Sequence, residues 1–89
     1  MASYKILWKK SVERDLRKIP KKFVYRIFEV VRELSENPFP GDVRKITGSK
    51  NLYRLRVGEY RIIYEVDTEN GVITIFHVRH RKDIYKTLR

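Results

Sequence analysis

Residues 52–64 read LYRLRVGEYRIIY and carry the clearest structural pattern in the chain. Apolar or aromatic side chains alternate with basic ones on both sides of a Gly58-Glu59 pair, and a period of two is that of a half-buried β-strand. Glycine in the first central position of a two-residue loop is typical of a tight hairpin turn. The stretch therefore predicts antiparallel strands over 52–57 and 60–67.

The loop length fixes which side chains share a face of this hairpin. With a two-residue loop, Val57 opposes Tyr60 and Arg56 opposes Arg61. One face is apolar and aromatic and is expected to lie against helices; its members are Leu55, Val57, Tyr60, Ile62 and Tyr64. The other face collects three arginines and one isoleucine, namely Arg54, Arg56, Arg61 and Ile63.

Like charges side by side on a sheet repel one another, so this second face is expected to bind an anion. An alternative stays open, because the arginines could pair with nearby acids such as Asp42, Glu59 or Glu65 in weak surface ion pairs. A β-bulge near Gly58 would also move one arginine to the other face.

A third strand is predicted over residues 72–80, after an Asn70-Gly71 pair that favours another tight hairpin. This register places Arg61 opposite His80, so His80 is expected to join the arginines. His77 is expected to pack against the core or cap an edge rather than to bind a ligand.

The N-terminal half of the chain has the period of helices. Residues 4–8 form a short β-prone segment that is expected to join the sheet. Ser11 fits the N-cap of a helix that reaches about Lys18, and Pro20 fits the first turn of a second helix that ends at Asn37-Pro38. The prediction is an α+β fold: an N-terminal strand, a two-helix hairpin and an antiparallel three-stranded meander, forming one sheet with the helices on one face.

Composition and charge narrow the functional classes. The 89 residues suit a single domain spanning 1–89, and the absence of cysteine with only two histidines predicts no metal site and no cofactor. A net charge of +10 favours a polyanionic partner, although charge alone leaves RNA, DNA, an acidic protein and an anionic membrane surface open. No apolar run approaches the roughly 20 residues of a membrane span, so a soluble, cytoplasmic protein is expected.

The residues near the end of the third strand suggest a chemistry. Residues 79–86 look like a strand end that turns into a tail, from which Arg81 and Tyr85 could fold over either side of the sheet. RNA cleavage without a metal needs cations to hold the phosphate and groups that move protons at the 2′-hydroxyl and the 5′-oxygen. His80 has a suitable intrinsic pKa, and Tyr85 could act if nearby cations lowered its pKa, or could stack on a base.

The same segments resemble a known family of proteins. Residues 52–64, followed by the run VRHRKDIY over 78–85, closely resemble the RelE/ParE toxin superfamily. Tyr4-Lys5-Ile6 at the start, Asn37-Pro38 after the helix and Lys45-Ile46-Thr47-Gly48 before the meander match as well, so the resemblance covers nearly the whole chain.

The resemblance implies an activity and site residues. RelE-type members are implied to enter the ribosomal A site and cleave mRNA, without a metal, by attack of the 2′-hydroxyl. Arg61 would hold the scissile phosphate, Arg81 would assist the transition state or the leaving group, and Tyr85 would activate the 2′-hydroxyl or stack on a base. Arg54 and Arg56 stand where well-known members carry lysines; arginine keeps the charge but does not readily deprotonate, so an electrostatic role is implied.

The resemblance also implies partners and further contacts. The implied partners are the ribosome, mRNA and an antitoxin from the same operon that covers the basic surface. Three further residues are expected to contact RNA, namely Lys45, His80 and Lys82. Two alternatives remain: a ParE-like inhibitor of DNA gyrase, which shares the Gly-x-Tyr-Arg hairpin, and a non-catalytic nucleic-acid-binding module.

Overall fold

The computed structural model describes the backbone of residues 3–87 and the side chains of residues 3–84. A five-stranded sheet in the order β1-β5-β4-β3-β2 forms the centre, with β1 parallel to β5 and the other neighbours antiparallel. In chain order the elements are β1 (Lys5–Trp8), α1 (Val12–Arg17), α2 (Lys21–Glu36), β2 (Arg44–Lys45), β3 (Leu52–Val57), β4 (Tyr60–Asp67), β5 (Val72–His80) and α3 (Arg81–Thr87).

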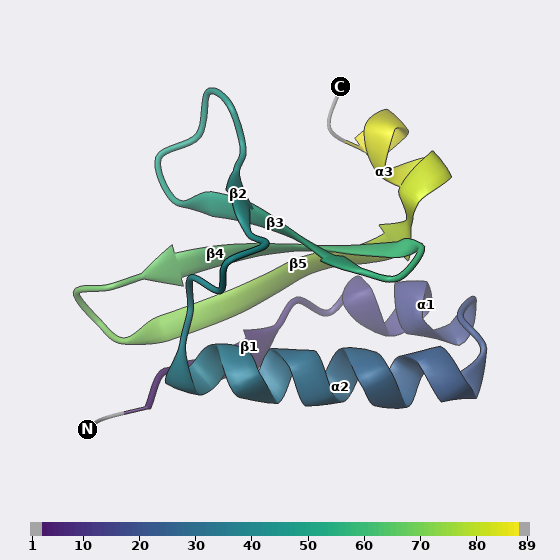
Figure 1. Cartoon of the computed structure of the whole chain (residues 1–89), viewed down its shortest axis with the longest axis horizontal. Helices are drawn as coiled ribbons and strands as arrows, with labels where there is room; N and C mark the ends of the chain where they lie inside the picture. The colour runs from purple at the N-terminus through teal and green to yellow at the C-terminus, as the bar shows by residue number, and fades with distance from the viewer. Residues whose placement is uncertain (1–2, 88–89) are drawn as a thin grey trace.

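The first two helices form a layer beneath the sheet (Figure 1). Helix α1 begins after Ser11, which occupies the N-cap position without a side-chain hydrogen bond. Helix α2 begins after Pro20 and ends at Glu36, because Asn37 is extended and precedes Pro38. The predicted helix boundaries therefore differ from the observed ones by about one residue.

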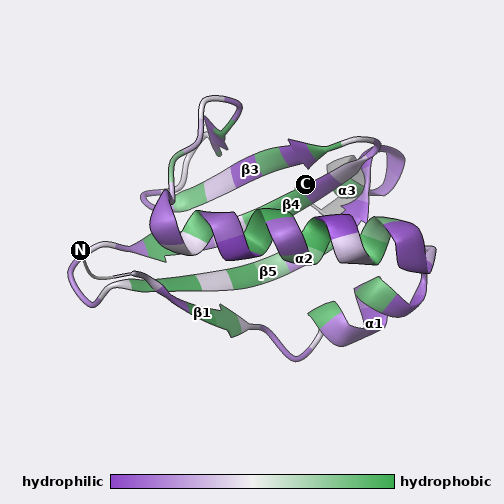
Figure 2. Cartoon of the chain, turned by 60° about the horizontal axis from the view of Figure 1, so that its bottom comes forward, coloured by the Kyte–Doolittle hydropathy of each residue, from purple (hydrophilic) through white to green (hydrophobic). Residues whose placement is uncertain are grey.

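The core lies between this helix layer and the sheet. Figure 2 shows α2 running across β4 and β5 with hydrophobic residues recurring along it, and its buried residues are Ile27, Val31 and Leu34. Tyr64 is fully buried, and its hydroxyl donates to the Pro38 carbonyl at 2.8 Å. Burial raises the pKa of Tyr64 far above its usual value, so this hydroxyl stays protonated.

The β3–β4 hairpin has the predicted register. Val57 opposes Tyr60 and Arg56 opposes Arg61 across the Gly58-Glu59 loop. Gly58 has a φ of 59°, whereas no non-glycine residue in the described part of the chain has a positive φ, as expected for a type II′ turn. The apolar face of the hairpin packs on the helices, so the predicted assignment of faces in β3 and β4 is confirmed.

The β4–β5 hairpin differs from the prediction in two ways. Asp67 opposes Val72, so the loop has four residues rather than two. Asp67 shapes this loop, because its carboxylate accepts hydrogen bonds from the backbone and side-chain amides of Asn70 at 3.1 and 2.8 Å. A β-bulge also shifts the register between Ile63 and Tyr64, which leaves Phe76 as an extra residue in β5.

The predicted α+β fold is confirmed, and the structure adds two elements to it. The two-residue strand β2 extends the sheet beyond β3. The C-terminal segment expected to be a tail is the helix α3, which stands on the side of the sheet opposite α1 and α2 (Figure 1). Ile63 and Ile84 are buried but lie outside the main core cluster, as expected if α3 covers the upper side of β4. Among the described residues, no helix is long and apolar enough to cross a membrane.

Candidate active site

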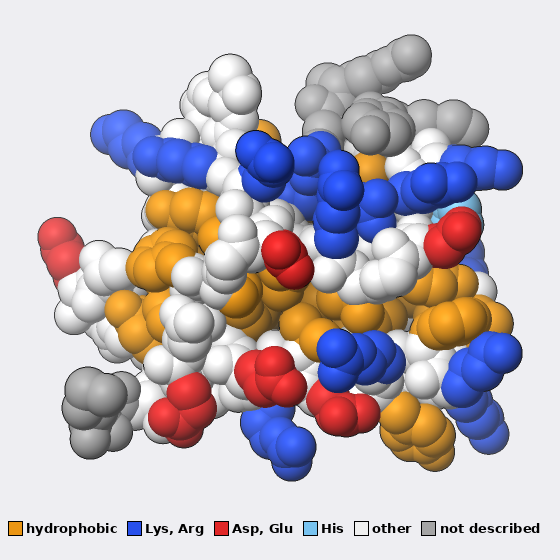
Figure 3. All heavy atoms as spheres, in the orientation of Figure 1, with side chains coloured by type: hydrophobic (Ala, Val, Ile, Leu, Met, Phe, Trp, Pro, Cys, Tyr) orange, Lys and Arg blue, Asp and Glu red, His pale blue; other side chains and the backbone are white. Residues whose placement is uncertain are grey.

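Four arginines of β2, β3 and β4 share the side of the sheet that faces away from α1 and α2; Arg79 of β5, opposite Arg61, has the same side but pairs with Asp15 of α1. Arg44 of β2 opposes Arg54 of β3, and Arg56 of β3 opposes Arg61 of β4. Directly opposite residues point to the same side of a sheet, with Cβ atoms about 4.5–5.5 Å apart. We call this surface, made of Arg44, Arg54, Arg56 and Arg61, the arginine face. Figure 3 shows a band of Lys and Arg side chains above the apolar residues, whereas over α2 below them Asp and Glu are mixed with Lys and Arg.

Arg61 is the most constrained of these residues. The residue is 9% exposed, and its Nη1 donates to the carbonyls of Gly58 and Tyr60 at 3.0 and 2.9 Å. The guanidinium is therefore held by the backbone of the hairpin turn in a place from which most water is excluded. A cation fixed in this way can stabilise negative charge without reorganising first.

In the part of the chain that the structure describes, the acids proposed as alternative partners, Asp42, Glu59 and Glu65, form no ion pair with Arg54 or Arg56. Glu59 turns instead towards the start of α3, where it pairs with His80 and Arg81. The sheet thus keeps a concentration of positive charge that a polyanion could compensate.

Arg44 is a member of the face that sequence reasoning missed. Its strand has only two residues, too few to show the alternation by which strands are recognised. Lys45, which was expected to bind RNA, opposes Tyr53 and so shares the side of the sheet on which the core packs. A signal was available, because two consecutive residues of a strand point to opposite sides of the sheet, so one of the basic pair Arg44-Lys45 in a strand beside β3 must share the side of Arg54.

Helix α3 brings the C-terminal candidates to the same end of the sheet. The backbone N–H of Arg81 donates to the Glu59 carbonyl at 2.7 Å, and Arg81 Nε lies 3.8 Å from Glu59 Oε2. Lys82 follows in the first turn of α3 and is exposed. The backbone of Tyr85 belongs to α3, but its side chain lies outside the described residues.

His80 does not lie on the arginine face, and the prediction that it would is wrong. It opposes Tyr60, which packs against the core, and the two rings meet edge to face with centroids 5.6 Å apart. The observed loop is two residues longer than the predicted one. A shift of two residues leaves each side chain of β5 on its predicted side of the sheet, so this error does not explain the position of His80. The single extra residue at Phe76 reverses the faces of everything after it in β5.

His77 stands on the other side of β5, opposite Ile63. Its Nδ1 is buried without a hydrogen-bond partner. Burial lowers the pKa of His77, and the nearby Arg79 lowers it further; Asp15 opposes this in part, and Lys9 adds the smallest lowering effect. The ring is therefore a neutral, half-buried group on the side of the sheet away from the main core cluster. The described residues contain no cluster of His, Asp and Glu suited to a metal ion.

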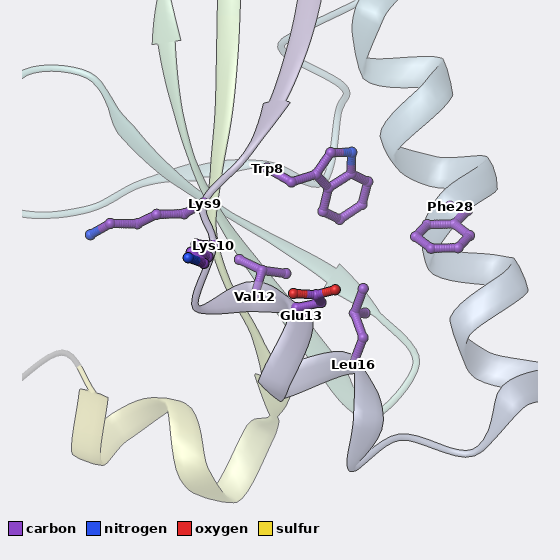
Figure 4. A pocket seen from close by; sticks show the side chains of 7 residues that line it. All are labelled: Trp8, Lys9, Lys10, Val12, Glu13, Leu16 and Phe28. Carbon is purple, nitrogen blue, oxygen red and sulfur yellow. The ribbon is translucent and has the colours of Figure 1, made fainter.

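Two hollows of the surface lie apart from the arginine face. Figure 4 shows an apolar pocket of about 320 Å³ on the helix side, where the rings of Trp8 and Phe28 meet edge to face with centroids 5.4 Å apart. A cleft of about 620 Å³ lies where α1 meets the ends of β4 and β5, and in it the buried Asp15 pairs with Arg79 at 3.4 Å. The arginine face suits an extended polymer better than a small enclosed ligand.

Comparisons with known proteins agree with this geometry. A family model described as "ParE toxin of type II toxin-antitoxin system, parDE" matches residues 6–85. The chain belongs to the RelE/ParE toxin superfamily. Within this superfamily it is 42% identical over 86 residues to Toxin RelE3 of Methanocaldococcus jannaschii, which covers 91% of this chain and 94% of that toxin.

Solved structures of superfamily members have the same fold. The archaeal RelE–RelB complex of Pyrococcus horikoshii contains a chain that superposes with a TM-score of 0.80 at 34% identity, over 89% of this chain and 96% of that one. The toxin–antitoxin complex RelBE2 of Mycobacterium tuberculosis gives a TM-score of 0.79 at 26% identity, over 89% and 99%. The chain is thus a homologue of RelE toxins along most of its length.

Proposed function

We propose that this protein is the toxin of a type II toxin–antitoxin system and acts as an endoribonuclease that cleaves mRNA in the ribosomal A site. The observation that carries the proposal is the arginine face, in which Arg61 is buried and anchored on two backbone carbonyls. The 42% identity to a RelE toxin over most of the chain supports the same assignment.

In the proposed reaction, the 2′-oxygen attacks the adjacent phosphorus and the bond from phosphorus to the 5′-oxygen breaks. The 2′-hydroxyl gives its proton to a base and the departing 5′-oxygen takes one up, so the products are a 2′,3′-cyclic phosphate and a 5′-hydroxyl end. Arg61 would hold the scissile phosphate, and Arg81 would stabilise the developing charge or the leaving group. The charge comes from arginines, so the proposed mechanism needs no metal.

The remaining candidates have supporting roles. Arg44, Arg54 and Arg56 would bind the phosphates that flank the cut, since each neutralised phosphate adds salt-sensitive affinity. Tyr85 is the candidate that activates the 2′-hydroxyl or stacks on a base. Two exposed lysines, Lys45 at the sheet edge and Lys82 in α3, would add contacts to ribosomal RNA.

A cognate antitoxin is the proposed protein partner. The relatives from Pyrococcus horikoshii and Mycobacterium tuberculosis were solved as toxin–antitoxin complexes. A net charge of +10 and the concentration of arginines on one side of the sheet suit a partner with acidic segments. Such a partner would compete with RNA, so adding it should abolish cleavage.

The test of this function is cleavage on programmed ribosomes, with the cut sites mapped by primer extension. We expect cuts confined to the A-site codon, and a loss of about 10²–10³ in rate when Arg61 or Arg81 is replaced by alanine. Arg32→Ala is the matched control, because it removes an exposed arginine from α2 on the opposite side of the molecule. Cleavage that is unchanged in the Arg61→Ala/Arg81→Ala double variant would refute the site.

Inhibition of DNA gyrase is the second candidate, because the matching family model is described by the ParE toxin. A supercoiling assay with purified gyrase separates the two activities. Inhibition of supercoiling by wild-type protein that does not cut ribosome-bound mRNA would favour the ParE-like activity. Binding of RNA with neither activity would indicate a non-catalytic module.

A further inference from the structure

The β3–β4 turn, besides joining two strands, contacts the side chain of Arg61 and the start of α3. The carbonyl of Gly58 accepts from Arg61 Nη1 at 3.0 Å, and the carbonyl of Glu59 accepts from the backbone N–H of Arg81 at 2.7 Å. The side chain of Glu59 adds an ion pair to Arg81, with Oε2 3.8 Å from Nε. One tight turn therefore contacts both of the arginines to which the proposed reaction assigns the main charges.

His80 connects the same turn to α3 through both of its ring nitrogens. Nδ1 lies 3.1 Å from the backbone N–H of Lys82, and Nε2 lies 3.1 Å from Glu59 Oε2. Because an amide can only donate, Nδ1 must be the unprotonated nitrogen, and Nε2 therefore carries the proton that it donates to Glu59. His80 thus caps the first turn of α3 and links the start of this helix to the carboxylate of Glu59.

We propose that Glu59 is a positioning residue, which fixes the start of α3 and the side chain of Arg81 against the turn that holds Arg61. The inference rests on the proposed function, because it concerns the alignment of two cations assigned to one reaction. Arg81 has a long side chain that is 54% exposed, so without a partner it samples many rotamers. The carboxylate narrows this range before RNA binds.

The opposite effect of Glu59 has to be weighed, because a carboxylate also weakens the field of a nearby cation. Glu59 is 62% exposed, and its 3.8 Å separation from Arg81 is that of a loose ion pair. Water screens such a pair, so it costs little of the charge that Arg81 presents to phosphate. The hydrogen bond between Glu59 and His80 brings no such loss, because His80 is not part of the proposed site. The net effect is therefore positioning.

The test compares Glu59→Gln with wild type in two measurements. The first is the single-turnover rate of mRNA cleavage as a function of ribosome concentration, which separates the maximal rate from half-saturation. The second is the order parameter of the Arg81 side-chain Nε–H group from ¹⁵N relaxation of the free protein. Glu69→Gln is the matched control, since it removes the same charge from the exposed β4–β5 loop at the far end of the sheet.

Positioning predicts a maximal rate that falls about two- to fivefold, half-saturation that stays within about twofold, and a lower order parameter at Arg81. The control should change none of these. An increased rate would mean that Glu59 competes with phosphate for Arg81, and would overturn the inference. Wild-type protein that cuts no mRNA would refute the proposed function alone, and the order parameter would then decide about Glu59: no change in Glu59→Gln would overturn its positioning role.

Discussion

At the scale of single residues, the position of Arg61 combines two properties that usually exclude each other. A buried arginine must have hydrogen-bond acceptors, yet a neighbouring carboxylate would cancel its charge. Gly58 and Tyr60 provide neutral backbone carbonyls, so Arg61 is satisfied in part without an opposite charge from these two contacts. These two contacts order the guanidinium without cancelling its charge.

Replacement of Arg61 by lysine tests whether geometry matters beyond charge. Lysine keeps the charge but loses the planar fork of donors, and it cannot bridge the two carbonyls in the same way. We expect the maximal rate of cleavage to fall about 10- to 100-fold, less than for Arg61→Ala. The rate is measured in single turnover on programmed ribosomes. A rate equal to that of wild type would show that a point charge is sufficient.

His77 makes the stability of the protein depend on pH. Its folded-state pKa lies below its unfolded value near 6.5, so the unfolded chain binds more protons between the two pKa values. The contribution of His77 to the free energy of unfolding should therefore be fully present above about pH 6.5 and be lost as the pH falls from there through the folded-state pKa. Denaturant unfolding at a series of pH values measures this loss.

The matched variants for this pH effect are His77→Phe and His80→Gln. We expect His77→Phe to flatten the dependence between about pH 7 and pH 5, because it removes the buried imidazole. His80→Gln leaves that group in place and should keep the dependence due to His77. Equal slopes in wild type and His77→Phe would assign the effect to other groups.

At the scale of elements, the strands were predictable because alternation and turn residues agree. The bounds of β3, β4 and β5 follow from the sequence, as do the faces of β3 and β4. The face of His80 was not predictable, because the bulge at Phe76 has no local sequence signature of its own. Helix α3 was missed because its few residues, between a strand and the chain end, show no full helical period.

The turn of the β3–β4 hairpin depends on one glycine. Gly58 has a φ of 59°, in the left-handed region that is costly for residues with a Cβ. We expect Gly58→Ala to lower the free energy of unfolding by about 1–2 kcal/mol, measured by denaturant titration. The strain is expected in the turn itself, so activity should also fall with the alignment of Arg61 and Arg81.

Gly41→Ala is the control for this substitution. Gly41 has no positive φ, and no heavy atom lies within 4 Å of an added Cβ. Alanine there should be neutral or slightly stabilising, because it reduces the entropy of the unfolded chain. A similar loss at both positions would mean that the backbone conformation of Gly58 is not the cause.

At the scale of the whole molecule, basic side chains concentrate on the sheet. The sheet presents arginines away from the helices, whereas acidic and basic side chains are mixed over α2 (Figure 3). Affinity for RNA should therefore fall steeply with salt, because bound cations release counterions from the phosphates. The slope of log affinity against log salt concentration measures how many phosphates are neutralised.

Single substitutions make this dependence specific to the arginine face. We expect Arg44→Ala, Arg54→Ala and Arg56→Ala each to reduce the slope by about one unit or slightly less, measured by binding to ribosomes at several salt concentrations. Arg32→Ala on α2 should leave the slope unchanged. An equal reduction by Arg32→Ala would indicate diffuse attraction to the whole molecule rather than to one face.

The extra residue at Phe76 has a consequence for evolution within the superfamily. The side of the sheet on which each residue from His77 to the start of α3 lies depends on this one extra residue of β5 relative to β4. An in-frame deletion of this one codon would leave both hairpin loops and most of the core sequence unchanged. It would nevertheless move the side chains of the last β5 residues to the opposite side of the sheet and change the direction in which α3 begins. Insertions and deletions of two residues, or changes in the four-residue loop before β5, should therefore be tolerated better than the insertion or deletion of a single residue inside the strand.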